Sequence, residues 1–303
     1  MSLKGAKIFR AAMLPVQRLP LGFHYAWGRV FSWFLKNVMH YRSDVVMANL
    51  ARSFPEMDYG RLKTVYGRFY DHLGEVFAEA MWFGGSEGRP GRLREQGFCT
   101  VEGAEDIAAA FVDSPSVMVM TSHYGNWEVM GGLFEYLGPD ADLPDGFEQD
   151  AVSVVYKHVQ NAFWEYFILR NRIAPLKDYS GEVESKRILR FALEHRNEKR
   201  IYIFPTDQHP YRGAAYAEIP DFMGRRTKVM TGGAALARKL GMSVFSMVLE
   251  RVEKGKYRMV LKKICDNAAE MEPVEIMERY FAILQESIEA APEFYLWSHK
   301  RWK

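Results

Sequence analysis

His123 and Glu128 stand five positions apart in the segment T-S-H-Y-G-N-W-E. The segment is preceded by the apolar residues 117–120. Together with Thr121 they predict a buried strand over residues 117–121. Apolar residues at helical spacing follow and predict a helix over residues 127–137, with Asn126 as its N-cap. We therefore expect His123 on a strand-to-helix loop and Glu128 in the first helical turn, where the helix dipole favours a carboxylate.

This arrangement offers a general base and an acid to orient it. Two residues on one continuous helix meet at a spacing of three or four, whereas a loop turns His123 back over the helix start. One imidazole nitrogen is then expected to meet Glu128, which fixes the tautomer and leaves the other nitrogen to take a proton from a hydroxyl. The alkoxide would attack an acyl carbonyl, and free N–H groups at the helix start would stabilise the oxyanion. The alternative is a buried histidine bonded to a helix end, beside a solvated acid.

Two pairs of arginines are also candidates for binding. Arg170 and Arg172 end a predicted helix over residues 160–172, where a guanidinium either binds a carboxylate or phosphate or completes the helix C-terminus. Arg225 and Arg226 follow a glycine turn, which predicts either an anion cradle or solvated surface.

Asp207 and Gln208 follow an apolar strand predicted over residues 201–204. The carboxyl ends of strands are where α/β sheets gather functional groups. Asp207 is therefore expected either to be catalytic or to hold loop amides.

Strand and helix signals alternate through the part of the chain that follows residue 92. This alternation predicts an α/β fold with a mixed, partly parallel sheet flanked by helices. A short basic helix at residues 42–54 and a long helix at residues 59–82 precede it, and a glycine-rich loop spans residues 84–92. Strands are predicted at 117–121, 152–156, 201–204, 244–249 and 257–264, and helices at 104–112, 127–137, 160–172, 183–196, 229–240 and 274–290.

The amino-terminal part of the chain is basic. Residues 1–68 contain 11 Lys and Arg against 3 Asp and Glu, although the whole chain carries only +2. Apolar positions at helical spacing over residues 21–39 are interrupted by Arg29 and Lys36, so this segment is not expected to span a membrane. It predicts either a helix lying in a membrane interface or an amphipathic helix docked on its own domain. We assign residues 1–50 to a membrane-docking helical arm and residues 51–303 to the α/β domain.

Several chemistries find no support in the sequence. Cys99 and Cys265 are far apart, so neither a disulfide framework nor a cysteine zinc site is expected. The motifs of serine hydrolases, phosphate-binding loops and dinucleotide-binding folds are missing. His123, Asp207 and His209 lack the compact spacing of a metal site. No removable signal peptide is expected, which places the catalytic part in the cytoplasm.

With its neighbouring motifs, the H-x4-E pattern resembles the bacterial lipid A late acyltransferases, a lysophospholipid-acyltransferase-like family. The resemblance covers roughly residues 19–303 and rests on several blocks. They are Tyr41-Arg42 through Asn49-Leu50, Ser53 to Glu56, Val155-Tyr156-Lys157 with Asn161 and Arg172, Asp207-Gln208 with Phe222 and Gly224, and Tyr295 to Lys303.

The resemblance implies transfer of a fatty acyl chain from acyl carrier protein to a hydroxyl of a lipid A precursor, at the cytoplasmic face of the inner membrane. His123 would be the general base and Glu128 its orienting acid. Arg172, or failing that Arg170, would steady the acyl carbonyl. Asp207, Gln208, Asn126 and Lys157 would complete the substrate site. No metal, cofactor or nucleic-acid partner is implied.

The sequence departs from the family pattern at Lys157, where many members carry arginine, and this replaces a bidentate contact with a point charge. Related enzymes acylate other glycolipids or aminolipids. An acyl thioesterase using the same His–Glu pair on water, and a non-catalytic binder using the basic arm alone, are further alternatives.

Overall fold

The computed structural model of this protein describes residues 3–303. Its strands are β1 (Cys99–Glu102), β2 (Val117–Thr121), β3 (Val152–Tyr156), β4 (Glu182–Glu184), β5 (Ile201–Pro205), β6 (Tyr216–Ile219), β7 (Thr227–Met230), β8 (Ser243–Glu253) and β9 (Lys256–Cys265). Its α-helices are α1 (Leu3–Gln17), α2 (Leu21–Asn37), α3 (Ser43–Ser53), α4 (Tyr59–Phe83), α5 (Arg92–Glu95), α6 (Ala104–Asp113), α7 (Leu133–Leu137), α8 (Ala162–Arg172), α9 (Ile188–Glu194), α10 (Gly232–Leu240) and α11 (Pro273–Ala290). Short 3₁₀ helices are η1 (Gly84–Ser86), η2 (Trp127–Gly132), η3 (Gln149–Ala151), η4 (Ala268–Glu270) and η5 (Pro292–Phe294).

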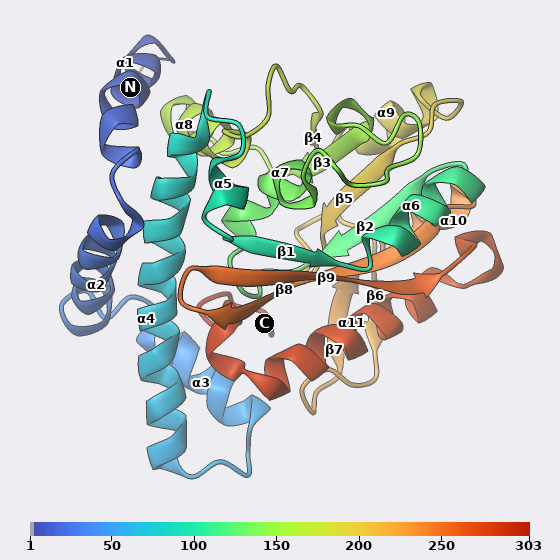
Figure 1. Ribbon diagram of the computed structural model, residues 1–303. Coiled ribbons are helices and arrows are strands. Elements are labelled where there is room, and N and C mark those ends of the chain that lie inside the picture. Colours follow the sequence, from blue (N-terminus) through green and yellow to red (C-terminus); the bar gives the residue numbers. More distant parts are fainter. Residues whose placement is uncertain (1–2) are drawn as a thin grey trace.

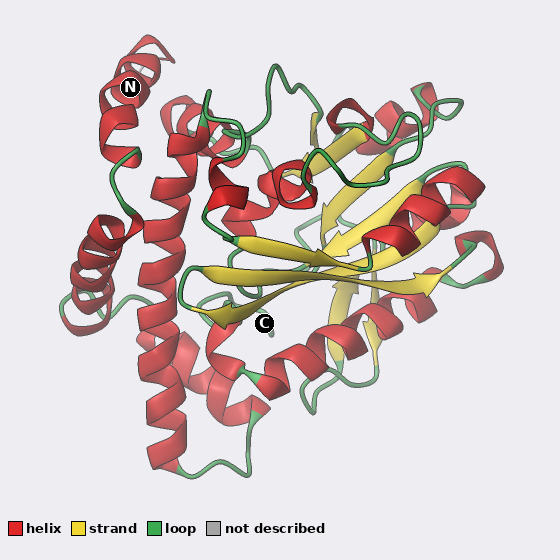
Figure 2. Cartoon of the chain, viewed as in Figure 1, coloured by secondary structure: helices red, strands yellow, loops and turns green. Residues whose placement is uncertain are grey.

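A seven-stranded sheet with the order β1-β9-β8-β2-β5-β3-β4 forms the centre of the molecule, and β6 pairs with β7 separately. Strands β8, β2, β5, β3 and β4 run parallel. Strand β9 is antiparallel to β8, and β1 is parallel to β9. Helices lie on both faces of the sheet (Figure 2). The predicted mixed, partly parallel sheet flanked by helices is therefore confirmed.

Strand β2 is buried along its whole length. Met118 and Met120 join one core cluster together with residues of α10 and α11, whereas Val117 and Val119 join a second cluster together with residues of α6. A strand with apolar neighbours on both faces has no polar positions to alternate with. This explains why the segment is an uninterrupted apolar run in the sequence.

Two predicted helices begin as strands in the structure. The helix predicted over 183–196 is strand β4 followed by α9, and the helix predicted over 229–240 begins inside β7 before α10. Strand β4 is only three residues long and is paired with β3, so its conformation depends on a distant partner rather than on a local pattern. The helix predicted over 127–137 is 3₁₀ helix η2 followed by α7.

Helix α4 stands between α2 and the sheet (Figure 1). The side of α2 buried in this contact carries His24, Gly28, Ser32 and Leu35. A β-carbon on Gly28 would lie 2.5 Å from the Gly74 carbonyl oxygen, so the two helices approach closely only because this position has no side chain. Helix α2 thus approaches α4 closely at Gly28, and the ring centroids of Phe31 and Phe77 lie 4.5 Å apart in the same contact.

The aromatic side of α2 faces away from α4. Phe23, Trp27, Val30, Trp33 and Phe34 are each at least 40% exposed. No helix within residues 3–303 combines the length and the apolar character needed to cross a bilayer.

The segment after α11 returns to the loop that follows β2. The backbone N–H of Leu296 donates to the His123 carbonyl at 3.1 Å, and the N–H of Gly125 donates to the Phe294 carbonyl at 3.0 Å. Asn49 of α3 donates to the Trp297 carbonyl at 2.8 Å. Residues 294–297 therefore link the loop after β2 to the amino-terminal helices.

Candidate active site

His123 lies directly beyond β2, and Asp207 lies directly beyond β5. These strands are parallel neighbours, with Thr121 paired to Pro205, so their carboxyl ends meet at one edge of the sheet. Nδ1 of His123 is 2.7 Å from Oδ1 of Asp207, and the backbone N–H of His123 donates to Oδ2 at 3.1 Å. Asp207 is 2% exposed. The carboxylate thus fixes both the ring and the backbone of His123.

Burial and charge act against each other at this pair. Burial lowers the pKa of His123, but the charge and hydrogen bond of Asp207 outweigh it, so the pKa of His123 is raised. Burial raises the pKa of Asp207, but His123 outweighs it, and the pKa of Asp207 is lowered. An ionised Asp207 accepts the Nδ1–H bond, which leaves Nε2 as the basic nitrogen.

Gln208 occupies the free side of the imidazole. Its Nε2 is 3.2 Å from Nε2 of His123, a separation that fits an amide N–H donating to the unprotonated ring nitrogen. A substrate hydroxyl that approaches this nitrogen has to replace the amide. The displaced amide would then be a donor close to the reacting atoms.

The predicted hydrogen bond between His123 and Glu128 is wrong, because Glu128 pairs with Arg172. Nε and Nη2 of Arg172 bond Oε2 and Oε1 of Glu128 at 2.7 and 2.6 Å, and Trp127 Nε1 donates to Oε1 at 3.0 Å. Burial raises the pKa of Glu128, but Arg172 outweighs it and the pKa is lowered. Glu128 therefore holds the arginine, whose side chain is 40% exposed.

Asn126 is the N-cap of η2, as predicted, since its Oδ1 accepts the N–H of Glu128 at 3.1 Å. A role for it in binding substrate stays a prediction. The residue is completely buried, and its Nδ2 donates to the Glu79 carboxylate at 2.6 Å. Both polar atoms of the side chain are thus used inside the protein.

The remaining predicted binding residues lie at different places. Arg170 Nη2 is 3.3 Å from Oε1 of Glu87, which also pairs with Arg10 of α1. Arg170 therefore joins α8 to the amino-terminal helix rather than to His123. Lys157 lies after β3, and its Nζ is 5.7 Å from the centre of the Tyr211 ring.

Of the two arginines on the predicted glycine turn, Arg225 is partly buried and Arg226 is exposed. Nη2 of Arg225 donates to Ser53 at 2.7 Å, and its guanidinium lies 3.4 Å from the centre of the Trp302 ring. Arg225 thus connects Ser53 at the end of α3 with Trp302 near the carboxyl-terminal end of the chain.

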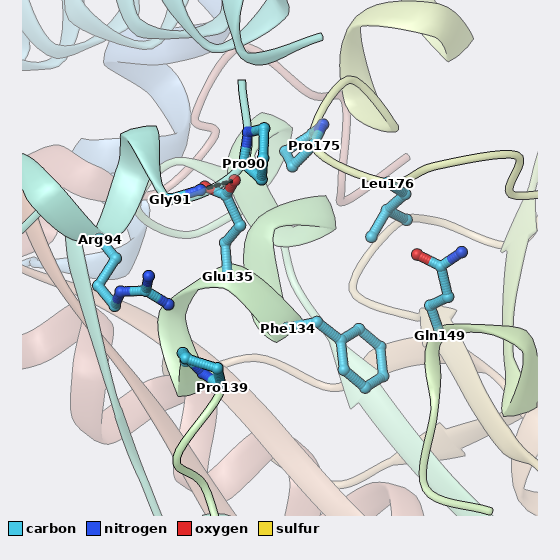
Figure 3. A pocket seen from close by; sticks show the side chains of 10 residues that line it. Pro90, Gly91, Arg94, Phe134, Glu135, Pro139, Gln149, Pro175 and Leu176 are labelled. Carbon is cyan, nitrogen blue, oxygen red and sulfur yellow. Dashed lines mark hydrogen bonds between the residues drawn. The ribbon is translucent and has the colours of Figure 1, made fainter. Parts of the chain in front are cut away.

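A surface depression of about 370 Å³ opens beside α7 (Figure 3). Phe134 of α7, Gln149, and Pro175 and Leu176 beyond α8 line it, together with Arg94. Neither His123 nor Asp207 is among its lining residues. The depression is therefore separate from the candidate active site.

Among residues 3–303, no group of three or more His, Cys, Asp and Glu side chains is placed to hold a metal ion. The polar side chains bonded to the His123 ring are the Asp207 carboxylate and the Gln208 amide.

Comparison with known proteins gives a consistent assignment. The family model described as bacterial lipid A biosynthesis acyltransferase matches residues 5–303. A lipid A biosynthesis palmitoleoyltransferase of Escherichia coli K12 is 23% identical over 270 residues, which cover 86% of this chain and 79% of the relative. A lipid A biosynthesis acyltransferase of Shigella flexneri matches with the same identity and coverage.

Proposed function

Because this chain belongs to the bacterial lipid A biosynthesis acyltransferase family and is an acyltransferase of lipid A synthesis, we propose the finer reaction and its mechanism. The protein moves a fatty acyl chain from acyl carrier protein to a hydroxyl of a lipid A precursor. The observation that carries this proposal is the His123–Asp207 pair, in which a buried carboxylate holds Nδ1 and leaves Nε2 as the base.

The acceptor hydroxyl replaces the Gln208 amide at Nε2 of His123 and gives up its proton to that nitrogen. The alkoxide attacks the thioester carbonyl, forming the new C–O bond, and the tetrahedral intermediate collapses by breaking the C–S bond. The imidazolium returns its proton to the leaving thiolate. Asp207 stabilises the imidazolium, and this scheme needs neither a covalent acyl-enzyme nor a cofactor.

Arg172 is the proposed donor for the oxyanion of the intermediate. Glu128 holds two of its nitrogens and so restricts the guanidinium. The charge of Arg172 is close enough to His123 to oppose part of the rise in the pKa of that imidazole. A fixed cation beside the reacting carbonyl stabilises negative charge without having to reorganise during the reaction.

Replacing His123 with alanine is expected to lower acceptor-dependent transfer about 10²–10⁴-fold, because the general base is lost. The assay uses purified protein in detergent, labelled acyl-carrier-protein donors and a panel of lipid acceptors that includes a lipid A precursor. His195→Ala is the matched control, since His195 follows the end of α9 and its Nδ1 bonds the Phe191 carbonyl within that helix. Donor hydrolysis that ignores the acceptor would indicate a thioesterase. Transfer that survives His123→Ala would exclude His123 as the base.

We further propose that α2 lies on the cytoplasmic surface of the inner membrane. Its exposed aromatic side, with Arg29 and Lys36 on the same helix, fits an apolar layer bordered by anionic headgroups.

Trp27→Glu and Trp33→Glu are each expected to lower the partition of the protein onto vesicles about tenfold or more, because a charge replaces an aromatic group that enters the interface. Co-sedimentation with vesicles containing anionic phospholipid measures this. Leu189→Glu is the control, since Leu189 is 53% exposed and belongs to α9, which lies on the opposite side of the molecule from α2 (Figure 1). Equal binding of all three variants would contradict the assignment of this surface.

A further inference from the structure

Glu79 of α4 is a completely buried carboxylate surrounded by hydrogen-bond donors. It accepts hydrogen bonds from the hydroxyls of Tyr25 and Tyr257 and from Nδ2 of Asn126, each at 2.6 Å. Burial raises the pKa of Glu79, and the three donors only partly offset this rise, so the pKa stays raised. Within the described residues 3–303, Glu79 forms no ion pair. The three donors therefore replace the water molecules that the carboxylate has lost on burial.

The contact with Asn126 decides which way that side chain points. An asparagine amide has a donor end and an acceptor end, and at this position the acceptor caps Glu128 while the donor meets Glu79. Rotating the amide by half a turn would set its NH₂ group against the N–H of Glu128 and its oxygen against the Glu79 carboxylate. Glu79 therefore selects the orientation that caps η2.

Helix α4 holds the same loop at a second point. Nε2 of His72, two helical turns before Glu79, lies 3.0 Å from the Gly125 carbonyl oxygen. Burial lowers the pKa of His72 to about 4, so the ring is neutral and donates this bond. The backbone bonds from residues 294–296 hold the other side of the loop. The loop that carries His123 is thus fixed between α4 and the segment after α11.

We propose that Glu79 is a positioning residue for acyl transfer, acting through Asn126 on the loop between His123 and Glu128. The inference rests on the proposed function. Glu79 is buried and touches neither His123 nor Asp207, so it acts only through the geometry of the loop. Tyr25 connects the same carboxylate to α2, which makes the docking of that helix part of the support for the active site.

Glu79→Gln and Glu79→Leu test whether the effect of Glu79 depends on its hydrogen-bond acceptor or only on the presence of a side chain of this size. Glutamine keeps an oxygen for Asn126, so kcat is expected to stay within about threefold of the unaltered enzyme. Leucine removes it, so kcat is expected to fall about 10- to 100-fold with little change in KM, since a small displacement of a catalytic group has effects of this size. Glu75→Gln is the control, because Glu75 lies on the same helix but pairs with Arg251 and Lys254. Its kcat is expected to be unchanged.

The triple variant Glu79→Leu, Tyr25→Phe, Tyr257→Phe distinguishes positioning from plain structural support. Removing the two hydroxyls together with the carboxylate leaves an apolar cluster without unpaired tyrosines, so the unfolding temperature is expected to recover toward that of the unaltered protein. The kcat is expected to stay low, because Asn126 still has no acceptor. Recovery of kcat together with stability would overturn the proposal, as would a Glu79→Gln variant as slow as Glu79→Leu.

The His123 ring resonances in protein labelled at histidine supply a second measurement, which does not depend on activity. They are expected to move in Glu79→Leu and in the triple variant but not in Glu79→Gln or Glu75→Gln. If the unaltered protein transfers no acyl chain, the proposed function fails while these shifts still test the positioning. Unchanged His123 resonances in the triple variant would contradict the positioning itself.

Discussion

Asparagine in place of Asp207 is expected to slow acyl transfer about 10²–10⁴-fold, because the amide no longer holds His123 in the tautomer with a basic Nε2. The measurement is kcat/KM for transfer to the lipid acceptor across a range of pH. Glu128→Gln provides the comparison, since it disrupts the support of Arg172 and leaves the bond between Asp207 and His123 in place.

The activity is expected to depend on pH through the protonation of His123. His123 acts as a base only when neutral, and its pKa is raised above the ordinary 6.5, so activity is expected to fall as the pH drops through that raised value. Asp207→Asn removes the largest contribution that raises this pKa and leaves burial to lower it. The pH at which activity falls on the acidic side should therefore be lower in Asp207→Asn than in the unaltered protein, although the variant transfers acyl chains more slowly. A larger displacement in Glu128→Gln would show that Glu128, and not Asp207, controls the imidazole.

Alanine in place of Gly125 is expected to lower the free energy of unfolding by at least about 2 kcal/mol and to reduce activity with it. Gly125 has φ of +65°, and a β-carbon there would lie 1.9 Å from the Leu249 carbonyl oxygen. Strand β8 would have to move away from the loop that presents His123. Urea unfolding and the transfer assay measure the two effects.

Gly88→Ala is the matched control for Gly125→Ala. Gly88 has φ of +69°, but a β-carbon there would meet no atom within 4 Å. Its expected cost is only the conformational one, about 1 kcal/mol. Equal destabilisation by the two substitutions would mean that the close approach of β8 contributes nothing.

The fold was predictable where the pattern is local and strong. The segments 117–121 and 152–156 coincide with β2 and β3, and the predicted N-cap at Asn126 is confirmed. The short strands were not predictable. Strand β1 and strand β4 complete the edges of the sheet, but their four and three residues carry too few positions for a recognisable alternation.

The candidate site was predictable in its residues but not in its pairing. His123, Asp207 and Gln208 were all singled out by their positions at strand ends, and the structure brings them together. Sequence spacing favours Glu128 as the partner of His123 because only five positions separate them. Asp207 is 84 positions away and becomes the partner through the pairing of β2 with β5. The order of strands in a sheet is a long-range property that residue spacing does not contain.

Glu79 was not identified as important from the sequence. The one available signal is that it stands three residues after Val76 and four before Phe83, two buried positions of α4. An acidic residue on the buried side of a helix predicts a satisfied polar contact, but its partners lie on α2, on β9 and in the loop after β2.

The bonds from residues 294–297 to the loop after β2 have a consequence for the order of events during synthesis. Helix α2, β2 and β5 leave the ribosome well before these residues do. Until residue 297 has emerged, the loop carrying His123 lacks the backbone partners at Phe294 and Leu296, and α3 lacks the carbonyl that accepts from Asn49. If α2 meets a lipid surface as proposed above, a nascent chain would reach that surface while the loop carrying His123 still lacks these partners, and attachment would precede activity.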